Sequence, residues 1–81
     1  MKVRVLFFAS LRERLGSAEA SWDLGDGASV GDLWSALCQA HPSLGELAGR
    51  VSFAVNREYA GKDHVLAPGD QIALIPPVSG G

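Results

Sequence analysis

The residues best suited to chemistry are the last six, PPVSGG, at positions 76–81. Pro76 and Pro77 favour polyproline II geometry, so from Pro77 the chain could reach roughly 15 Å beyond a folded body at about 3.1 Å per residue. Gly80 and Gly81 have no Cβ atoms, so the end can enter a channel too narrow for other side chains. At its tip is the α-carboxylate of Gly81. A carboxylate becomes a useful electrophile only when one oxygen is converted into a leaving group, as by adenylation.

The simplest alternative for this segment is a frayed end, because chain termini are usually disordered and tolerant of change. A strand followed by a stiff proline spacer and two glycines without side chains is better explained by a second interpretation. In this interpretation the tail inserts its terminal carboxylate into a cavity of another protein.

The other potentially reactive side chains do not have the spacing expected of a catalytic or metal-binding site. His41 and His64 are separated by a whole predicted strand, and neither has a cysteine or acidic partner at metal-ligand spacing, so we expect surface or capping roles for both. Cys38 is the only cysteine, without a basic neighbour, and is expected to be a packed thiol. The GDG turn at 25–27 lacks the spacing and the lysine of a phosphate-binding loop. We therefore expect no bound metal, no bound cofactor and no active site within this chain.

Composition limits the class of protein. The 81 residues are enough for one domain, and 47% of them are hydrophobic, as in globular proteins. A net charge of −2 gives no electrostatic footprint for nucleic acid, and no apolar run has the length of a membrane span. We expect a cytoplasmic protein that binds neither nucleic acid nor membrane.

Four runs of sequence predict strands around one main helix. Residues 3–9 and 71–76 are apolar and β-branched, residues 18–24 alternate, and residues 51–56 form a further strand. Residues 56–62 are polar and turn-like, and residues 64–66 could form a short strand. Ser10 to Gly16 has room for one or two helical turns, and residues 43–49 form a short connector with at most one more. Pro68 and Gly69 suit the centre of a type II turn.

The main helix has a clear start and end. Ser29 and Asp32 match a capping box, and the proline after His41 disfavours helical geometry there. One apolar stripe follows helical spacing: Val30, Leu33, Trp34, Leu37 and Cys38.

This order predicts an α+β roll of the β-grasp type, a mixed sheet of four to five strands with the helix packed on one face. The first and last strands have the most continuous apolar runs, so we expect them in the interior of the sheet. Residues 1–75 would form the domain and residues 76–81 an extended C-terminal tail.

Alternation in the first strand predicts an exposed patch. Val3, Val5 and Phe7 should face the helix, whereas Lys2 and Arg4 share the other face with Leu6 and Phe8. Ile75 adjoins the tail and should share that face. We predict a partner interface of Phe8 and Ile75 with Arg12 and Tyr59 near its rim. The alternative is a small second core on that side of the sheet.

Three segments carry a resemblance to a known family: VLFFASLRERLG near the start, FAVN in the middle and LAPGDQIALIPPVSGG at the end. The chain resembles the small subunits of molybdopterin synthase, a family of ubiquitin-like sulfur carriers, over residues 3–81. The resemblance implies that an activating enzyme similar to ubiquitin E1 consumes ATP to adenylate Gly81. A sulfur donor enzyme then supplies sulfur, giving a thiocarboxylate.

The same resemblance implies a partner. The tail would carry the thiocarboxylate into the large synthase subunit, within a heterotetramer. There the thiocarboxylate would supply sulfur to cyclic pyranopterin monophosphate. The tail residues that would enter the large subunit are Pro76, Pro77, Val78, Ser79 and Gly80. The catalytic side chains would belong to the large subunit. The alternatives are a sister carrier for thiamine thiazole or another thiolated product, a protein modifier joined to lysines through Gly81, and a purely structural interaction domain. The last would leave the tail unexplained.

Overall fold

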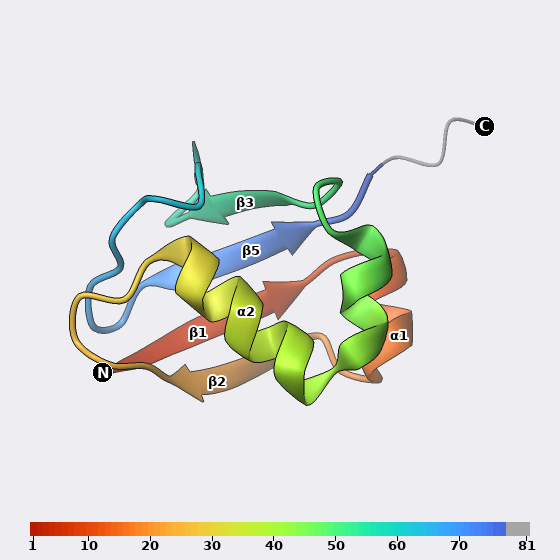
Figure 1. Ribbon diagram of the computed structural model, residues 1–81, viewed down its shortest axis with the longest axis horizontal. Helices are drawn as coiled ribbons and strands as arrows, with labels where there is room; N and C mark the ends of the chain where they lie inside the picture. Colours follow the sequence, from red (N-terminus) through yellow and green to blue (C-terminus); the bar gives the residue numbers. More distant parts are fainter. Residues whose placement is uncertain (78–81) are drawn as a thin grey trace.

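The structure is a computed structural model that describes residues 1–77 (Figure 1). Its elements follow in the order β1 (Lys2–Phe7), α1 (Ser10–Leu15), β2 (Glu19–Asp23), α2 (Val30–Ala40), the 3₁₀ helix η1 (Pro42–Leu47), β3 (Ser52–Val55), β4 (Glu58–Ala60) and β5 (Gln71–Ile75).

The strands form one mixed sheet in the order β2-β1-β5-β3-β4. The central pair, β1 and β5, is parallel, and every other pair is antiparallel. The prediction that the first and last strands are interior is confirmed. Their alternate residues Val3, Val5 and Phe7 on β1 and Ile72 and Leu74 on β5 are all at most 3% exposed, which places one face of both strands in the core.

Helix α2 crosses that face of the sheet (Figure 1). It begins with the predicted capping box: the Asp32 amide donates to Ser29 Oγ at 3.2 Å, and the Ser29 amide donates to the Asp32 carboxylate at 2.9 Å. Its buried residues are Val30, Leu33, Trp34 and Leu37. The rings of Trp34 and Phe53 meet edge to face at 5.7 Å between centroids, which joins the helix to β3. The β-grasp prediction is confirmed.

Two glycines occupy the positions that the predicted turns require. Gly16 ends α1 with φ 69°, in the left-handed conformation that favours glycine at a helix end. Gly69 has φ 82° in the turn that leads into β5, and the Asp70 amide donates to the Ala67 carbonyl at 3.1 Å. The type II turn at Pro68 and Gly69 is therefore confirmed. The connector after α2 contains a 3₁₀ helix, η1.

The prediction for residues 56–66 was wrong. Strand β4 lies at Glu58–Ala60, inside the segment expected to be a turn, whereas the expected strand at 64–66 makes only an isolated bridge between Val65 and Ser29. The turn between β3 and β4 consists of Asn56 and Arg57, with φ 50° and 74°, as in a two-residue type I′ hairpin, and a second turn follows β4 at Lys62 and Asp63. Because β4 is an edge strand with one neighbour, backbone pairing to β3 holds it without an apolar run.

None of the helices within residues 1–77 combines the length and the apolar character needed to cross a membrane.

Candidate functional site

The chain leaves the sheet at the end of β5. Ile75 is the last residue of that strand and pairs with Ser52 on β3. Pro76 follows and is buried, and Pro77 is exposed. Since proline has no amide hydrogen, neither residue can extend the ladder. The remaining predicted tail residues, Val78, Ser79, Gly80 and Gly81, lie outside the described residues.

Phe8 and Ile75 lie beside this exit point. Phe7 pairs with Leu74 in the parallel β1–β5 ladder, so the next residues along, Phe8 and Ile75, are level with each other on the opposite face. Phe8 is 40% exposed and Ile75 is half-buried. The same face carries the exposed ion pair between Arg4 and Glu19, at 2.9 Å, so it is a solvent-facing surface rather than a second core. We call this surface the open face.

A row of four residues crosses the open face from β1 to β4. The registers place Leu6 beside Ala73, Ala73 beside Ala54, and Ala54 beside Tyr59. Tyr59 is 79% exposed at the edge of the sheet. Tyr59 therefore shares the open face with Phe8 and Ile75, and two small alanines lie between Tyr59 and Leu6 in the row.

Sequence reasoning missed Ala54 as a member of this row. The residues on both sides of it in β3, Phe53 and Val55, are buried and apolar, and Ala54 is itself only 7% exposed. Apolar residues on both faces hide the alternation that would have assigned Ala54 to the open face. Strand pairing is the signal that finds it.

Arg12 is placed differently from the other predicted interface residues. It lies on α1 with an exposed side chain and makes no ion pair with any residue among 1–77. The structure thus brings Phe8 and Ile75 together and places Tyr59 on the same face, while Arg12 belongs to the helix that follows β1.

The remaining reactive side chains are isolated. His41 is the residue that ends α2, where its amide donates to the Leu37 carbonyl, and His64 is exposed, in line with the predicted capping and surface roles. Cys38 packs against the core, and burial raises the pKa of its thiol although Lys62 opposes the shift. Among residues 1–77, no group of three or more His, Cys, Asp or Glu side chains could hold a metal ion. No polar or charged residue of this part of the chain is buried.

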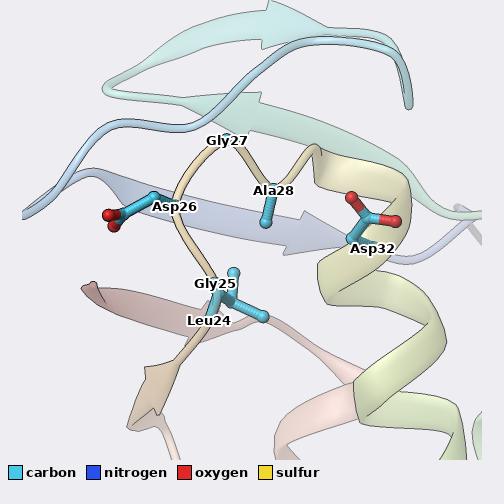
Figure 2. Close-up of a pocket in the computed structure, with 6 residues that line it drawn as sticks. All are labelled: Leu24, Gly25, Asp26, Gly27, Ala28 and Asp32. Carbon is cyan, nitrogen blue, oxygen red and sulfur yellow. The ribbon is translucent and has the colours of Figure 1, made fainter.

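An open depression between β2 and α2 is lined by Leu24, Gly25, Asp26, Gly27, Ala28 and Asp32 (Figure 2). Its two carboxylates do not converge on a common point. Asp32 is engaged in the capping box, and the Asp26 side chain is 97% exposed. This loop is a helix start with a glycine-rich turn, and the exit of β5 remains the better candidate for a functional site.

Comparison with known proteins identifies the family of the chain. Residues 5–81 match the model of the ThiS family. A molybdopterin synthase sulfur carrier subunit of Chlamydomonas reinhardtii is 42% identical over the full length of both chains. The small archaeal modifier protein 1 of Haloferax volcanii is also 42% identical, covering 91% of this chain and 94% of that protein.

Solved structures show the same fold. The crystal structure of the Haloferax modifier matches all of this chain and all of that one with a TM-score of 0.87 and 38% identity. A chain of the complex of subunits 1 and 2 of molybdopterin-converting factor from Helicobacter pylori matches with a TM-score of 0.71 and 28% identity, covering 100% of each chain. Because the family model covers nearly the whole chain and the relatives align end to end, this chain belongs to the ThiS family and has its ubiquitin-like β-grasp fold.

Proposed function

We propose that this chain is the sulfur carrier subunit of a molybdopterin synthase. The observation that carries the proposal is the exit of the chain at Pro76 and Pro77 beside the exposed Phe8 and the half-buried Ile75. This arrangement joins a docking surface to the segment that bears the terminal carboxylate. End-to-end similarity to the Chlamydomonas sulfur carrier subunit supports the same assignment.

The chemistry takes place at Gly81. An activating enzyme uses ATP to adenylate the carboxylate: a carboxylate oxygen attacks the α-phosphorus and pyrophosphate leaves. A sulfur nucleophile at the oxidation level of sulfide, supplied by a donor enzyme, then attacks the acyl carbon, and AMP leaves to give a thiocarboxylate. In the large subunit, the thiocarboxylate sulfur bonds to a carbon of cyclic pyranopterin monophosphate, water cleaves the acyl–sulfur bond and restores the Gly81 carboxylate, and two such transfers build the dithiolene of molybdopterin.

The division of labour is the one that the family resemblance implies. The catalytic side chains would lie in the large subunit, the activating enzyme would use the ATP, and the carrier would bind no cofactor. Residues 1–77 contain no buried polar or charged side chain, which is compatible with this division. The Helicobacter complex supports a two-subunit assembly.

The direct test is reconstitution. The purified chain is incubated with ATP, an activating enzyme and a sulfur source, and its intact mass is measured. Replacement of one terminal oxygen by sulfur, about 16 Da, is expected, and the product should form molybdopterin when it is mixed with the large subunit and the pterin substrate. A chain whose mass stays unchanged, or a thiocarboxylate that yields no molybdopterin, would refute the assignment.

A second candidate is a protein modifier attached through Gly81 to lysines of target proteins. The specific observation in its favour is the 42% identity to the Haloferax modifier protein. Both functions begin with activation of the carboxylate, so the acceptor distinguishes them. Denaturing purification of the tagged chain from cells, followed by mass spectrometry, should give free thiocarboxylate for a carrier and branched peptides ending in Gly-Gly on lysine for a modifier.

A further inference from the structure

The two prolines at the end of β5 differ in burial. Ile72 and Leu74 are fully buried on the core face, and their neighbours Ala73 and Ile75 are half-buried on the open face. Pro76 continues this alternation and is buried, whereas Pro77 is exposed. Pro76 is therefore packed as part of the domain, and it is the last buried residue of the part of the chain that the structure describes.

The neighbouring strands explain why the chain stops pairing there. Ser52 is the first residue of β3 and pairs with Ile75, and β1 has already ended at Phe7. After Phe8 the backbone turns into α1 through Ala9, whose φ is 50°. Pro76 thus lies past the last paired residue of both neighbours. Side-chain burial, and not a backbone hydrogen bond of its own amide, holds it in place.

The backbone is restricted at three consecutive residues. Proline fixes φ near −65° at Pro76 and Pro77, and each proline keeps the residue before it in extended geometry, here Ile75 and Pro76. The direction in which Pro77 leaves the sheet is therefore set by the buried ring of Pro76 together with the paired residue Ile75.

We infer that Pro76 is a positioning residue for sulfur loading. Its buried ring fixes the point and the direction in which the chain leaves the sheet, and thereby helps to place the Gly81 carboxylate for reaction. The inference rests on the proposed function, since it concerns delivery of the Gly81 carboxylate. Docking would be provided by the open face, and alignment of the carboxylate with the activating enzyme by Pro76. A misplacement of about 1 Å can cost roughly a hundredfold in rate, so loss of the buried ring should affect turnover more than docking.

The kinetic test varies the concentration of the carrier in the activation and sulfur-transfer reaction and follows thiocarboxylate by mass. Pro76→Gly removes the buried ring and the fixed φ. We expect kcat to fall at least about tenfold while KM for the carrier stays unchanged. Pro76→Val restores an apolar, β-branched side chain to the buried row but not the fixed φ, so it should recover part of the turnover. Ile72→Val is the matched control, because it removes one buried methylene from the same row without touching the exit and should leave both constants unchanged.

A second measurement, of thermal stability, tests whether the buried Pro76 ring anchors the end of β5, and it needs no partner protein. The thermal midpoint of Pro76→Gly should fall by about 4 °C or more, because a buried ring is lost, whereas Pro77→Gly should shift it by less than about 2 °C. Equal shifts for the two variants would refute the anchor.

The kinetic outcomes separate the two proposals. If the unaltered chain forms no thiocarboxylate, the proposed function fails and the positioning role fails with it. If the unaltered chain reacts normally and Pro76→Gly reacts equally well, only the positioning role is refuted. Loss of turnover in Ile72→Val to the same extent as in Pro76→Gly, or no recovery in Pro76→Val, would also refute it, because the effect would then not depend on an apolar anchor at position 76.

Discussion

Single residues at the exit of β5 have opposite environments although all of them are apolar. Pro76 is buried, whereas Phe8, two-fifths exposed, and Ile75, half-buried, face the solvent on the side away from the helix. Burying Phe8 fully against a partner would release further free energy, because a buried phenylalanine contributes about 1.5–3 kcal/mol relative to an exposed one. Exposed aromatic side chains at the centre of an interface are common binding hot spots.

Substitution of Phe8 by Asp tests this surface. A carboxylate buried without a partner is costly, so we expect the affinity for the large subunit to fall at least about 30-fold, or roughly 2 kcal/mol, while circular dichroism shows a folded domain. Affinity is measured by isothermal titration calorimetry. Val65→Asp is the matched control, because Val65 is also apolar and 61% exposed but lies in the loop beside the start of α2. Unfolding of Phe8→Asp would instead show that Phe8 supports the fold itself, and the docking role would be refuted.

Asp70 gives the fold a pH dependence. The pKa of its carboxyl is lowered from 3.8, mainly because the Ala67 amide donates to it at 2.8 Å and also because the Asn56 side-chain amide donates at 2.9 Å. Since the folded-state pKa is below the unfolded one, this contribution to stability is present above about pH 4 and is lost as pH falls through the folded-state pKa.

The measurement is urea denaturation between about pH 6 and pH 2. Asp70→Asn removes this titration, so the unfolding free energy of the variant should fall less steeply below pH 4 than that of the unaltered chain. Identical slopes would show that the two hydrogen bonds do not favour the ionised carboxyl.

Among the elements, α2 and the β3–β4 hairpin show different sources of stability. The helix is held by burial of an apolar stripe, and Leu37 is fully buried within it. The hairpin has a short edge strand and depends on its turn, where Asn56 donates to Asp70 and accepts from the Gln71 amide at 3.0 Å. Core packing should therefore dominate the response of α2 to mutation, and backbone conformation that of the hairpin.

Leu37→Ala should cost about 2–5 kcal/mol of unfolding free energy, a large share of the 4–12 kcal/mol that is typical of a domain of this size. Guanidinium denaturation measures the loss, and Gln39→Ala on the exposed side of α2 is the control. Sulfur transfer per folded molecule should be unchanged. A stable but inactive Leu37→Ala chain would mean that the helix contacts the partner, which would reverse our assignment of the two faces.

Arg57→Gly should stabilise the protein by about 1 kcal/mol, because Arg57 has φ 74° in a type I′ turn and glycine adopts this conformation without a Cβ clash. The change is measured as a rise in the thermal midpoint. Asn56→Gly is the control: its φ of 50° is also left-handed, but the change removes two side-chain hydrogen bonds and should give no such gain. A lower midpoint for Arg57→Gly would show that its side chain contributes more than the backbone strain costs.

At the scale of the whole molecule, one core supports the fold of residues 1–77, and we propose that the reactive end of the chain is the segment that follows. Helix α2 covers one face of the sheet, and the chain leaves β5 at the end opposite the N-terminus (Figure 1). Changes at residues 78–81 should therefore alter reactivity without altering the stability that the core provides.

Deletion of Gly81 should nearly abolish thiocarboxylate formation, since the carboxylate is withdrawn by about 3 Å, and Gly80→Val should fail because a branched side chain must enter a narrow channel. Both variants should keep an unfolding free energy within about 0.5 kcal/mol of the unaltered chain. Mass measurement of the product and thermal denaturation check the two expectations. Gly25→Ala, at a glycine with open space around it and far from β5 in sequence, is the control. If the chain that lacks Gly81 formed the thiocarboxylate normally, the terminal glycines would have no specific role and would be an ordinary frayed chain end.

The sequence alone determined the features that depend on local interactions. The capping box at Ser29 and Asp32, the end of α2 before Pro42 and the turn at Pro68 and Gly69 involve residues a few positions apart, so their patterns are visible in one dimension. The apolar runs of β1 and β5 likewise predicted interior strands, and both strands lie between two others with only Lys2 and Arg4 exposed among their residues.

The tertiary structure decided what depends on residues far apart in the chain. The position of β4 followed from pairing with β3, which makes a polar segment into an edge strand. The place of Ala54 on the open face followed from its neighbours on β5 and β4. The burial of Pro76 separated it from Pro77, although the sequence treats the two prolines alike. Burial and strand pairing are set by which distant segments pack together, and no local pattern of residue types encodes them at these three positions.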